Sequence, residues 1–113
     1  LSETGTGATF TRSNIIDFSP GLVVGFIYDG DNPVATERVK IYINGVENIG
    51  LSQSQPSSLF NSNADIMLGA INISGTPSGI FDGEIGEVIY SLDTSLDITK
   101  IQQNQMEAFG ITN

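Results

Sequence analysis

Short segments rich in Val, Ile, Tyr and Phe alternate with clusters of Gly, Asn, Asp, Ser and Pro, and this pattern constrains the fold most. Leu22 to Tyr28 carries apolar side chains on both faces, which predicts a central strand. Arg38 to Ile43 alternates apolar and polar residues, as the strands of a half-exposed sheet do. Asn44-Gly45 follows and predicts a hairpin, because a type I′ turn needs positive φ at both positions. Val46 to Leu51 is therefore expected to return antiparallel.

Four more segments have the composition of strands and are separated by turn residues. These strands are predicted at Ala8–Arg12, Asn14–Phe18, Asp65–Ala70 and Phe81–Tyr90. Gly83 and Gly86 interrupt the last of them, which indicates a bulge or a close approach of another backbone. The stretches Ser52–Asn63 and Ile71–Ser78 are expected to be loops, because they are rich in turn-forming residues.

One helix is predicted near the C-terminus. Asp97 is a suitable N-cap before Ile98, and Gly110 stands where a left-handed C-cap belongs. The stripe at helical spacing comprises Ile98, Ile101, Gln105, Ala108 and Phe109. Several short strands with regular turn signals indicate an antiparallel sandwich or barrel, with the helix covering one end or edge. The predicted fold is all-β, an antiparallel β-sandwich (jelly roll) with one short C-terminal helix, in a single domain over residues 1–113.

The charge of the chain and its missing residue types argue against several classes of function. Thirteen acidic residues against four basic ones give a formal net charge of −9. Binding to phosphate backbones needs a dense positive surface, so neither nucleic acid nor an anionic membrane surface is expected as a partner. No apolar run approaches the roughly 18 residues of a membrane-spanning helix. Cys and His are absent, which removes thiolate chemistry and the commonest general base near neutral pH.

Two parts of the sequence resemble a known superfamily when their motifs are taken in order. The first part reads VVGFIYDG and then RVKIYINGVE, and the second reads DIMLGA and then FDGEIGEVIYSLDTSLDITKIQQNQMEAFGI. They are similar to the concanavalin A-like lectin/glucanase superfamily, in its laminin G-like branch. The resemblance covers roughly Gly21 to Ile111 and lies in the order and spacing of the motifs. It implies a sandwich that binds a carbohydrate or another ligand.

The resemblance also bears on the N-terminal part of the fold. Sandwiches of that family usually include further N-terminal strands, whereas this chain begins close to the middle of the pattern. Three alternatives are therefore open. The chain is a minimal version of the fold, it pairs with a strand of a partner, or it lacks a disordered N-terminal part. An open sheet edge invites pairing with another chain, so a homo-oligomer or a larger assembly is expected.

Asp82, Glu84 and Glu87 are the candidate carboxylates for a glycoside hydrolase, an activity that the superfamily includes. Such enzymes use paired carboxylates as acid/base and nucleophile, and the two must converge on one cleft. In an unbulged strand Asp82 and Glu84 share a face, but Glu87 falls on the opposite one. Trp, the usual platform for stacking sugars, is absent. Hydrolysis is therefore a minor alternative, and the chain is not expected to be an enzyme.

Oxygen-bearing side chains gather in the loop that starts at Asp29. Asp29, Asp31 and Asn32 are the predicted ligands of a Ca²⁺ ion, together with Asp65 from a second cluster. Loops of the resembled family often carry Ca²⁺ as well. The same residue types form tight turns without any metal, and this simpler interpretation is favoured.

The predicted ligand-binding residues are Lys40 and Tyr42, on the exposed face of their strand, and Asn44 of the turn. Tyr is a good contact for sugars and proteins, although ordinary surface decoration of a sheet is the simpler alternative. Two functions remain open. One is a non-catalytic carbohydrate- or ligand-binding and adhesion module of a surface or virion protein, with a glycan or surface protein as partner. The other is a structural virion decoration, spike or fibre subunit that assembles as an oligomer. Both imply an extracellular, cell-surface or virion location.

Overall fold

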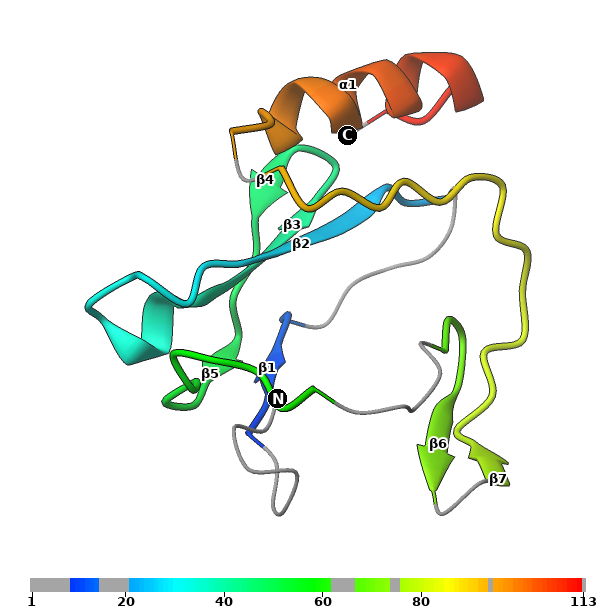
Figure 1. Cartoon of the computed structure of the whole chain (residues 1–113). Helices are drawn as coiled ribbons and strands as arrows, with labels where there is room; N and C mark the ends of the chain where they lie inside the picture. Colours follow the sequence, from blue (N-terminus) through cyan, green and yellow to red (C-terminus); the bar gives the residue numbers. More distant parts are fainter. Residues whose placement is uncertain (1–8, 15–20, 62–66, 74–75, 94, 113) are drawn as a thin grey trace. The chain divides into compact units, whose positions relative to one another are not determined.

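Antiparallel strands, a 3-10 helix and an α-helix near the C-terminus make up the regular structure of the described residues. The computed structural model describes residues 9–14, 21–61, 67–73, 76–93 and 95–112 (Figure 1). The chain divides into two compact units, Leu1–Asn61 with Asp93–Asn113 and Ser62–Leu92, and each is described by itself. The predicted β-rich class with one short C-terminal helix is confirmed. Within the described ranges, no helix is long and apolar enough to cross a membrane.

The first unit contains a three-stranded antiparallel sheet. Its strands are β2 (Val24–Tyr28), β3 (Val39–Ile43) and β4 (Val46–Glu47), in the order β2-β3-β4. The predicted strand at Leu22–Tyr28 is confirmed as β2. The prediction that it is a central strand is wrong, because β2 lies at the edge of the sheet in the described residues. The middle strand is β3, and Phe26 of β2 is 72% exposed. Apolar residues on both faces of a strand show what can be buried, but they do not specify how many strands flank it.

The turn between β3 and β4 has the predicted geometry. Asn44 has a φ of 50° and Gly45 a φ of 80°, so both residues adopt the left-handed conformation that a type I′ turn needs. The return strand is shorter than predicted, because pairing with β3 covers Val46 and Glu47 and continues through one bond from Asn48 N to the Ile41 carbonyl, at 2.8 Å. The chain then leaves β3 and forms another sheet.

That second sheet joins residues far apart in the sequence. Strand β5 (Leu51–Ser52) pairs antiparallel with β1 (Thr11–Arg12). The strand predicted at Ala8–Arg12 is thus confirmed in its last two residues, with Ala8 outside the described residues. Of the strand predicted at Asn14–Phe18, only Asn14 is described, and its N–H donates to the Asn48 side chain at 2.8 Å.

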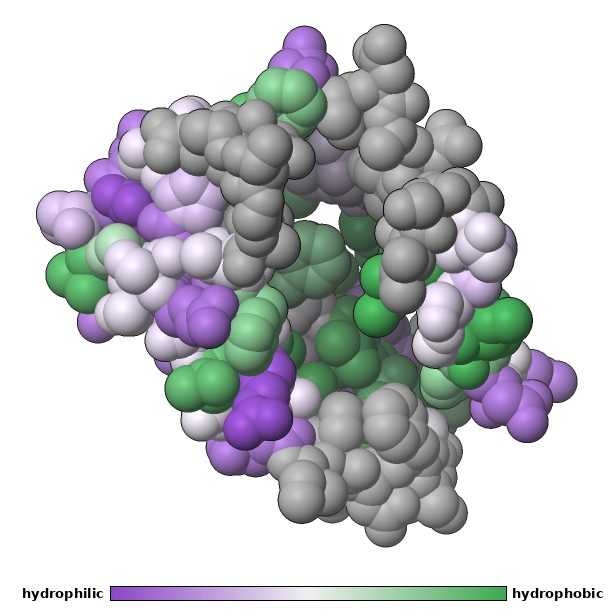
Figure 2. Space-filling model, turned by 90° about the horizontal axis from the view of Figure 1, so that it is seen from below, coloured by the Kyte–Doolittle hydropathy of each residue, from purple (hydrophilic) through white to green (hydrophobic). Residues whose placement is uncertain are grey.

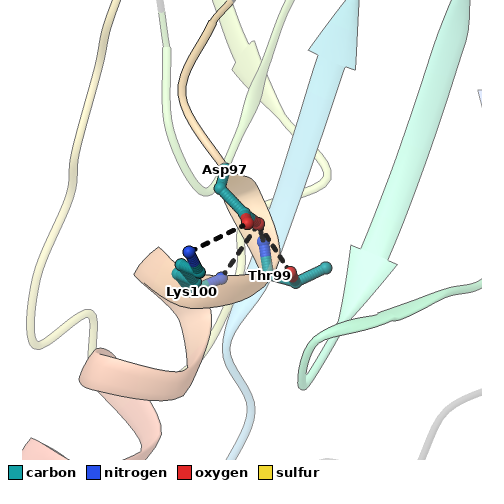
Figure 3. A network of polar contacts seen from close by, with 3 residues as sticks. All are labelled: Asp97, Thr99 and Lys100. Atoms are coloured by element: carbon teal, nitrogen blue, oxygen red, sulfur yellow. Dashed lines mark hydrogen bonds and ion pairs between the residues drawn. The ribbon is translucent and has the colours of Figure 1, made fainter.

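The helix α1 (Ile98–Phe109) begins and ends at the predicted caps. The Asp97 carboxylate accepts hydrogen bonds from Thr99 N, at 3.1 Å, and Lys100 N, at 3.2 Å (Figure 3). At the other end Gly110 has a φ of 65°, and Ile111 N donates to the Met106 carbonyl, at 2.8 Å, as in a Schellman motif.

The buried stripe of α1 differs in part from the predicted one. The less exposed positions of the helix are Ile98, Thr99, Ile101, Gln102, Gln105 and Met106. Ala108 and Phe109, which were predicted to belong to the stripe, are exposed. The sheet contact is made near the start of the helix, at Ile98 and Gln102, so the last turn extends past it.

Gly25 allows α1 to approach β2 closely. A Cβ atom at Gly25 would lie 2.8 Å from both Ile98 Cδ1 and Gln102 Nε2. Gln102 is only 2% exposed, and its Nε2 donates to the carbonyls of Tyr42, at 3.2 Å, and Val23, at 3.4 Å. Its Oε1 accepts from Gly45 N at 2.7 Å. One polar side chain therefore joins the helix to the end of the β3–β4 hairpin.

The second unit, Ser62–Leu92, contains one short hairpin. Strand β6 (Ile71–Ile73) pairs antiparallel with β7 (Thr76–Ser78). The stretch predicted as the loop Ile71–Ser78 therefore holds both strands. The strand predicted at Asp65–Ala70 is wrong for residues 67–70, which are irregular, and residues 65 and 66 lie outside the described part.

The long strand predicted at Phe81–Tyr90 is wrong. Residues 81–90 are irregular, although Phe81 N donates to the Gly69 carbonyl at 2.7 Å (Figure 1). A strand needs a neighbour that pairs along its length, and among the described residues of this unit β6 and β7 pair with each other. The aromatic ring of Phe81 lies over Gly83, where a Cβ atom would be 2.5 Å from the ring. The atoms close to Gly83 thus belong to a side chain, and the predicted bulge or close approach of another backbone is not seen at this glycine.

Candidate functional site

Lys40 and Tyr42 lie on one face of β3, as their spacing predicts. Glu47 of β4 pairs directly with Tyr42 and joins the same face. Its carboxylate lies 3.6 Å from the Lys40 ammonium, and the two side chains are 38% and 48% exposed for Lys40 and Glu47 respectively. Tyr42 is half-buried, and its strand partner Gly25 is in contact with α1. The predicted face therefore carries a polar cluster that is open to solvent only in part.

Asn44 is held by the backbone of the hairpin. Its side-chain oxygen accepts a hydrogen bond from Val23 N at 2.8 Å, and its own N–H donates to the Val23 carbonyl at 2.9 Å. These bonds fix the turn next to the first residues of β2. The structure thus gives Asn44 a conformational role and does not group its side-chain oxygen with the Lys40–Glu47 pair.

A small cavity lies beside β3. Its volume is about 200 Å³, and its lining comprises Thr36, Glu37, Val39, Lys40, Glu47 and Ile49. We call this cavity the β3 hollow. Sites for drug-sized ligands usually measure about 300–1,000 Å³, so the β3 hollow is the right size for one ring or one side chain of a larger ligand.

The wall of the β3 hollow that carries Glu37 is the 3-10 helix η1 (Ala35–Glu37). Buried Gln55 secures it, because Gln55 N donates to the Ala35 carbonyl at 2.9 Å. Arg38 follows η1 and donates through Nη1 to the Gln55 carbonyl, at 2.7 Å, and through Nε to the Asn32 carbonyl, at 3.0 Å. The position of Glu37 thus depends on hydrogen bonds to main-chain carbonyls rather than on an apolar core.

Among the described residues, Gln55 and Gln102 are buried polar side chains that sequence reasoning missed. The spacing of Gln102, four residues after Ile98, places both on one side of a helix and could have indicated its burial. Gln55 lies in a polar stretch without periodicity, and its partners Thr9 and Thr11 are more than 40 residues away. No short-range signal could have identified it.

The loop predicted to hold Ca²⁺ uses its oxygen atoms to close turns. Asp29 Oδ1 accepts from Asp31 N at 3.1 Å, and Asn32 Oδ1 accepts from Val34 N at 2.9 Å. These are the turns that the simpler interpretation expects from Asp and Asn. The remaining predicted ligand, Asp65, lies outside the described residues. In the ranges that are described, no group of three or more acidic, His or Cys residues is arranged to hold a metal ion.

The loop that starts at Asp29 and the Asn44-Gly45 turn lie at opposite ends of the β2–β3–β4 sheet. Asp29 directly follows the end of β2 at Tyr28, which pairs with Val39. Asn44 follows the other end of β3, where Ile43 pairs with Val24. The two ends are separated by the five residues of β3, and each residue of a strand adds about 3.3 Å. One small ligand therefore cannot contact both ends.

The candidate carboxylates of a hydrolase lie in the irregular segment of the second unit. Asp82, Glu84 and Glu87 are all exposed. Because residues 81–90 do not form a strand, alternation along a strand does not place Asp82 and Glu84 on a common face. The geometric argument for a catalytic pair is therefore lost.

Two carboxylates before and at the start of α1 have altered acidity. Hydrogen bonds from the side chain and backbone of Ser95 lower the pKa of Asp93. The hydrogen bond from the Thr99 hydroxyl, followed by the one from Lys100 N, lowers the pKa of Asp97 (Figure 3). In both cases the donors stabilise the ionised carboxylate. The donors lie within three residues of each carboxylate, and neither Asp93 nor Asp97 lines the β3 hollow.

Several apolar side chains reach the surface (Figure 2). Val24, Phe26 and Val46 are exposed in the three-stranded sheet. Val24 pairs with Ile43, Phe26 with Ile41, and Ile43 with Val46, so these residues share one face. That face is opposite to the one that carries Lys40, Tyr42 and Glu47. The sheet therefore has one apolar face and one mixed face, since Ile27 and Gly25 pair with Lys40 and Tyr42, and α1 packs on the mixed face at Gly25. We call the part of the mixed face with Lys40, Tyr42 and Glu47 its polar face.

Comparisons with protein-family models, with curated proteins and with solved structures find no match to this chain.

Proposed function

We propose that the chain is a non-catalytic binding module that recognises a glycan or a surface protein through the polar face of β3 and β4. The observation that carries this proposal is the Lys40–Glu47 ion pair in the lining of the β3 hollow, with Tyr42 paired to Glu47 on the same face of the sheet. A half-buried Tyr offers a rigid apolar surface, and the ion pair offers donors and acceptors for hydroxyl groups. A shallow site with few convergent polar groups suits binding more than it suits catalysis.

The proposal includes the concanavalin A-like sandwich and its laminin G-like form. Of the motifs that resemble this superfamily, the first part spans the β2–β3–β4 sheet and the end of the second part spans the capped helix, whereas the motifs at residues 67–70 and 81–90 are irregular. An apolar sheet face such as the one with Val24, Phe26 and Val46 is what a sandwich places against its second sheet. An extracellular, cell-surface or virion location goes with this function.

An assembly role is the second candidate, favoured by the same apolar face. Exposed apolar patches on a sheet are typical of protein–protein interaction sites. A structural virion decoration, spike or fibre subunit would use such a face to form a homo-oligomer. Light scattering at micromolar concentration distinguishes the two roles, because a symmetric trimer or a larger assembly without ligand binding favours the structural one.

The binding role is tested on a glycan array, with and without Ca²⁺ because Asp29, Asp31 and Asn32 are the predicted ligands of that ion. We expect binding that Tyr42→Ala abolishes. Tyr90→Ala is the matched control, since Tyr90 is exposed and lies in the other unit. Retention of the far-ultraviolet dichroism spectrum shows that each variant is folded. Failure of the unmodified chain to bind any glycan or surface protein, with or without Ca²⁺, would refute the binding role.

A further inference from the structure

The charges around the β3 hollow indicate which class of ligand it accepts. Glu37 and Glu47 contribute two carboxylates to the lining, and Lys40 contributes one ammonium group. The Lys40 ammonium lies 3.6 Å from the Glu47 carboxylate, so its positive charge is already compensated. The lining is therefore net negative, within a chain whose formal net charge is −9.

An anionic ligand would be repelled at short and at long range. Within the β3 hollow it would meet the carboxylate of Glu37, whose charge adds to the balanced Lys40–Glu47 pair, and like charges about 4 Å apart repel even in water. Outside the hollow, the net charge of the chain acts over about 8 Å at physiological ionic strength. An uncharged ligand is not repelled at either range, and a protonated amine is attracted by the same negative charges.

The hydrogen-bonding groups and the apolar residues point to a hydroxylated ring. Carboxylates accept hydrogen bonds from hydroxyl or amino groups, the Lys40 ammonium donates, and the Thr36 hydroxyl can do both. Val39 and Ile49 add apolar surface for the C–H side of a ring. The volume of about 200 Å³ limits the occupant to one such ring.

We infer that the β3 hollow binds one neutral or amino-bearing sugar ring and rejects carboxylated or sulphated sugars. This inference rests on the proposed binding function and adds the chemical class of the ligand. Glu37 and Glu47 are its specificity-determining residues, because their two carboxylates outnumber the one ammonium group of Lys40 in the lining.

The test compares oligosaccharides of glucosamine, glucose and glucuronic acid, which share a ring and differ in charge. By titration calorimetry at low salt, we expect the glucosamine oligomer to bind at least roughly tenfold more tightly than the glucuronic acid oligomer. The Glu37→Gln/Glu47→Gln double variant is expected to reduce this ratio. Glu107→Gln, on the exposed side of α1, removes one negative charge outside the hollow, half of what the double variant removes, and is expected to leave the ratio unchanged.

The outcomes separate the inference from the function on which it rests. Equal or tighter binding of the glucuronic acid oligomer refutes the charge preference while leaving the binding function intact. An unchanged ratio in the double variant refutes the role of Glu37 and Glu47. Binding of none of the three oligomers overturns the inference, and if the glycan array is also blank, the proposed function fails with it.

Discussion

Replacing Gln102 with Ala removes the three hydrogen bonds that join α1 to the β2–β3–β4 sheet. Gln102 Oε1 accepts from Gly45 N at 2.7 Å, and Nε2 donates to the carbonyls of Tyr42 and Val23 at 3.2 and 3.4 Å. The side chain is 2% exposed, so water cannot simply take its place. The variant therefore leaves Gly45 N without this partner and opens a cavity beside Gly25.

The size of the effect follows from the length of these bonds. A hydrogen bond contributes about 0.5–1.5 kcal/mol to stability, and a buried donor left without a partner costs about 1–3 kcal/mol. The short bond to Gly45 counts in full, whereas the two bonds of Nε2 are near the long limit and add less. We expect Gln102→Ala to lower the free energy of unfolding by about 2–3 kcal/mol.

Urea denaturation followed by far-ultraviolet dichroism measures this loss. Gln103→Ala is the matched control, because Gln103 is the exposed neighbour in the same helix and the substitution changes helix propensity equally. The difference between the two variants therefore isolates the buried contacts. If both variants unfold at the same urea concentration, the reasoning that Gln102 anchors the helix is refuted.

Three further predictions concern local contacts. The lowered pKa of Asp97 means that its cap contributes stability above pH 3.8 and loses it as the pH falls through the folded-state value. Asn can cap the helix without titrating, so the melting temperature of the Asp97→Asn variant should depend less on pH below 3.8 than that of the unmodified chain. Parallel curves of melting temperature against pH for the two proteins would contradict this. Gly45→Ala should cost about 1–2 kcal/mol because φ is 80°, and Gly45→Asn should cost less; equal losses in urea denaturation would argue against strain at this position. Arg38→Lys should lower the free energy of unfolding by about 1–2 kcal/mol in the same assay, because the compact ammonium of Lys cannot reproduce the two bonds that the guanidinium fork makes to separate carbonyls. Arg12→Lys, at an exposed position, should leave the free energy of unfolding nearly unchanged. Similar losses in the two Arg variants would contradict that role.

Features that depend on a few consecutive residues could be predicted from the sequence. The Asn44-Gly45 turn follows from the low cost of the left-handed conformation at Asn and Gly. The limits of α1 follow from a carboxylate at Asp97 and a glycine at position 110, each of which satisfies backbone groups within one turn. The shared face of Lys40 and Tyr42 follows from the alternation of a strand.

The candidate site could be predicted only in part, because most of its members come from separate segments. Lys40 is a predicted member, but Glu37 joins it through the position of η1 and Glu47 through the register of β4. Asn44, Asp29 and Asn32 are predicted ligands, but the side chains of Asp29 and Asn32 close local turns and that of Asn44 binds the backbone of Val23. Residue type alone does not distinguish these two uses of a side-chain oxygen.

The sequence by itself determined the turns, the caps and the side chains that share a strand face, since these depend on steric and hydrogen-bonding rules that act within about one turn of chain. Tertiary structure decided that β3, and not β2, is the middle strand, that residues 81–90 are irregular, and that Gln102 is buried. The physical reason is that a strand forms its hydrogen bonds with another segment of the chain, and a buried side-chain amide forms its hydrogen bonds with the backbone that the fold places opposite it.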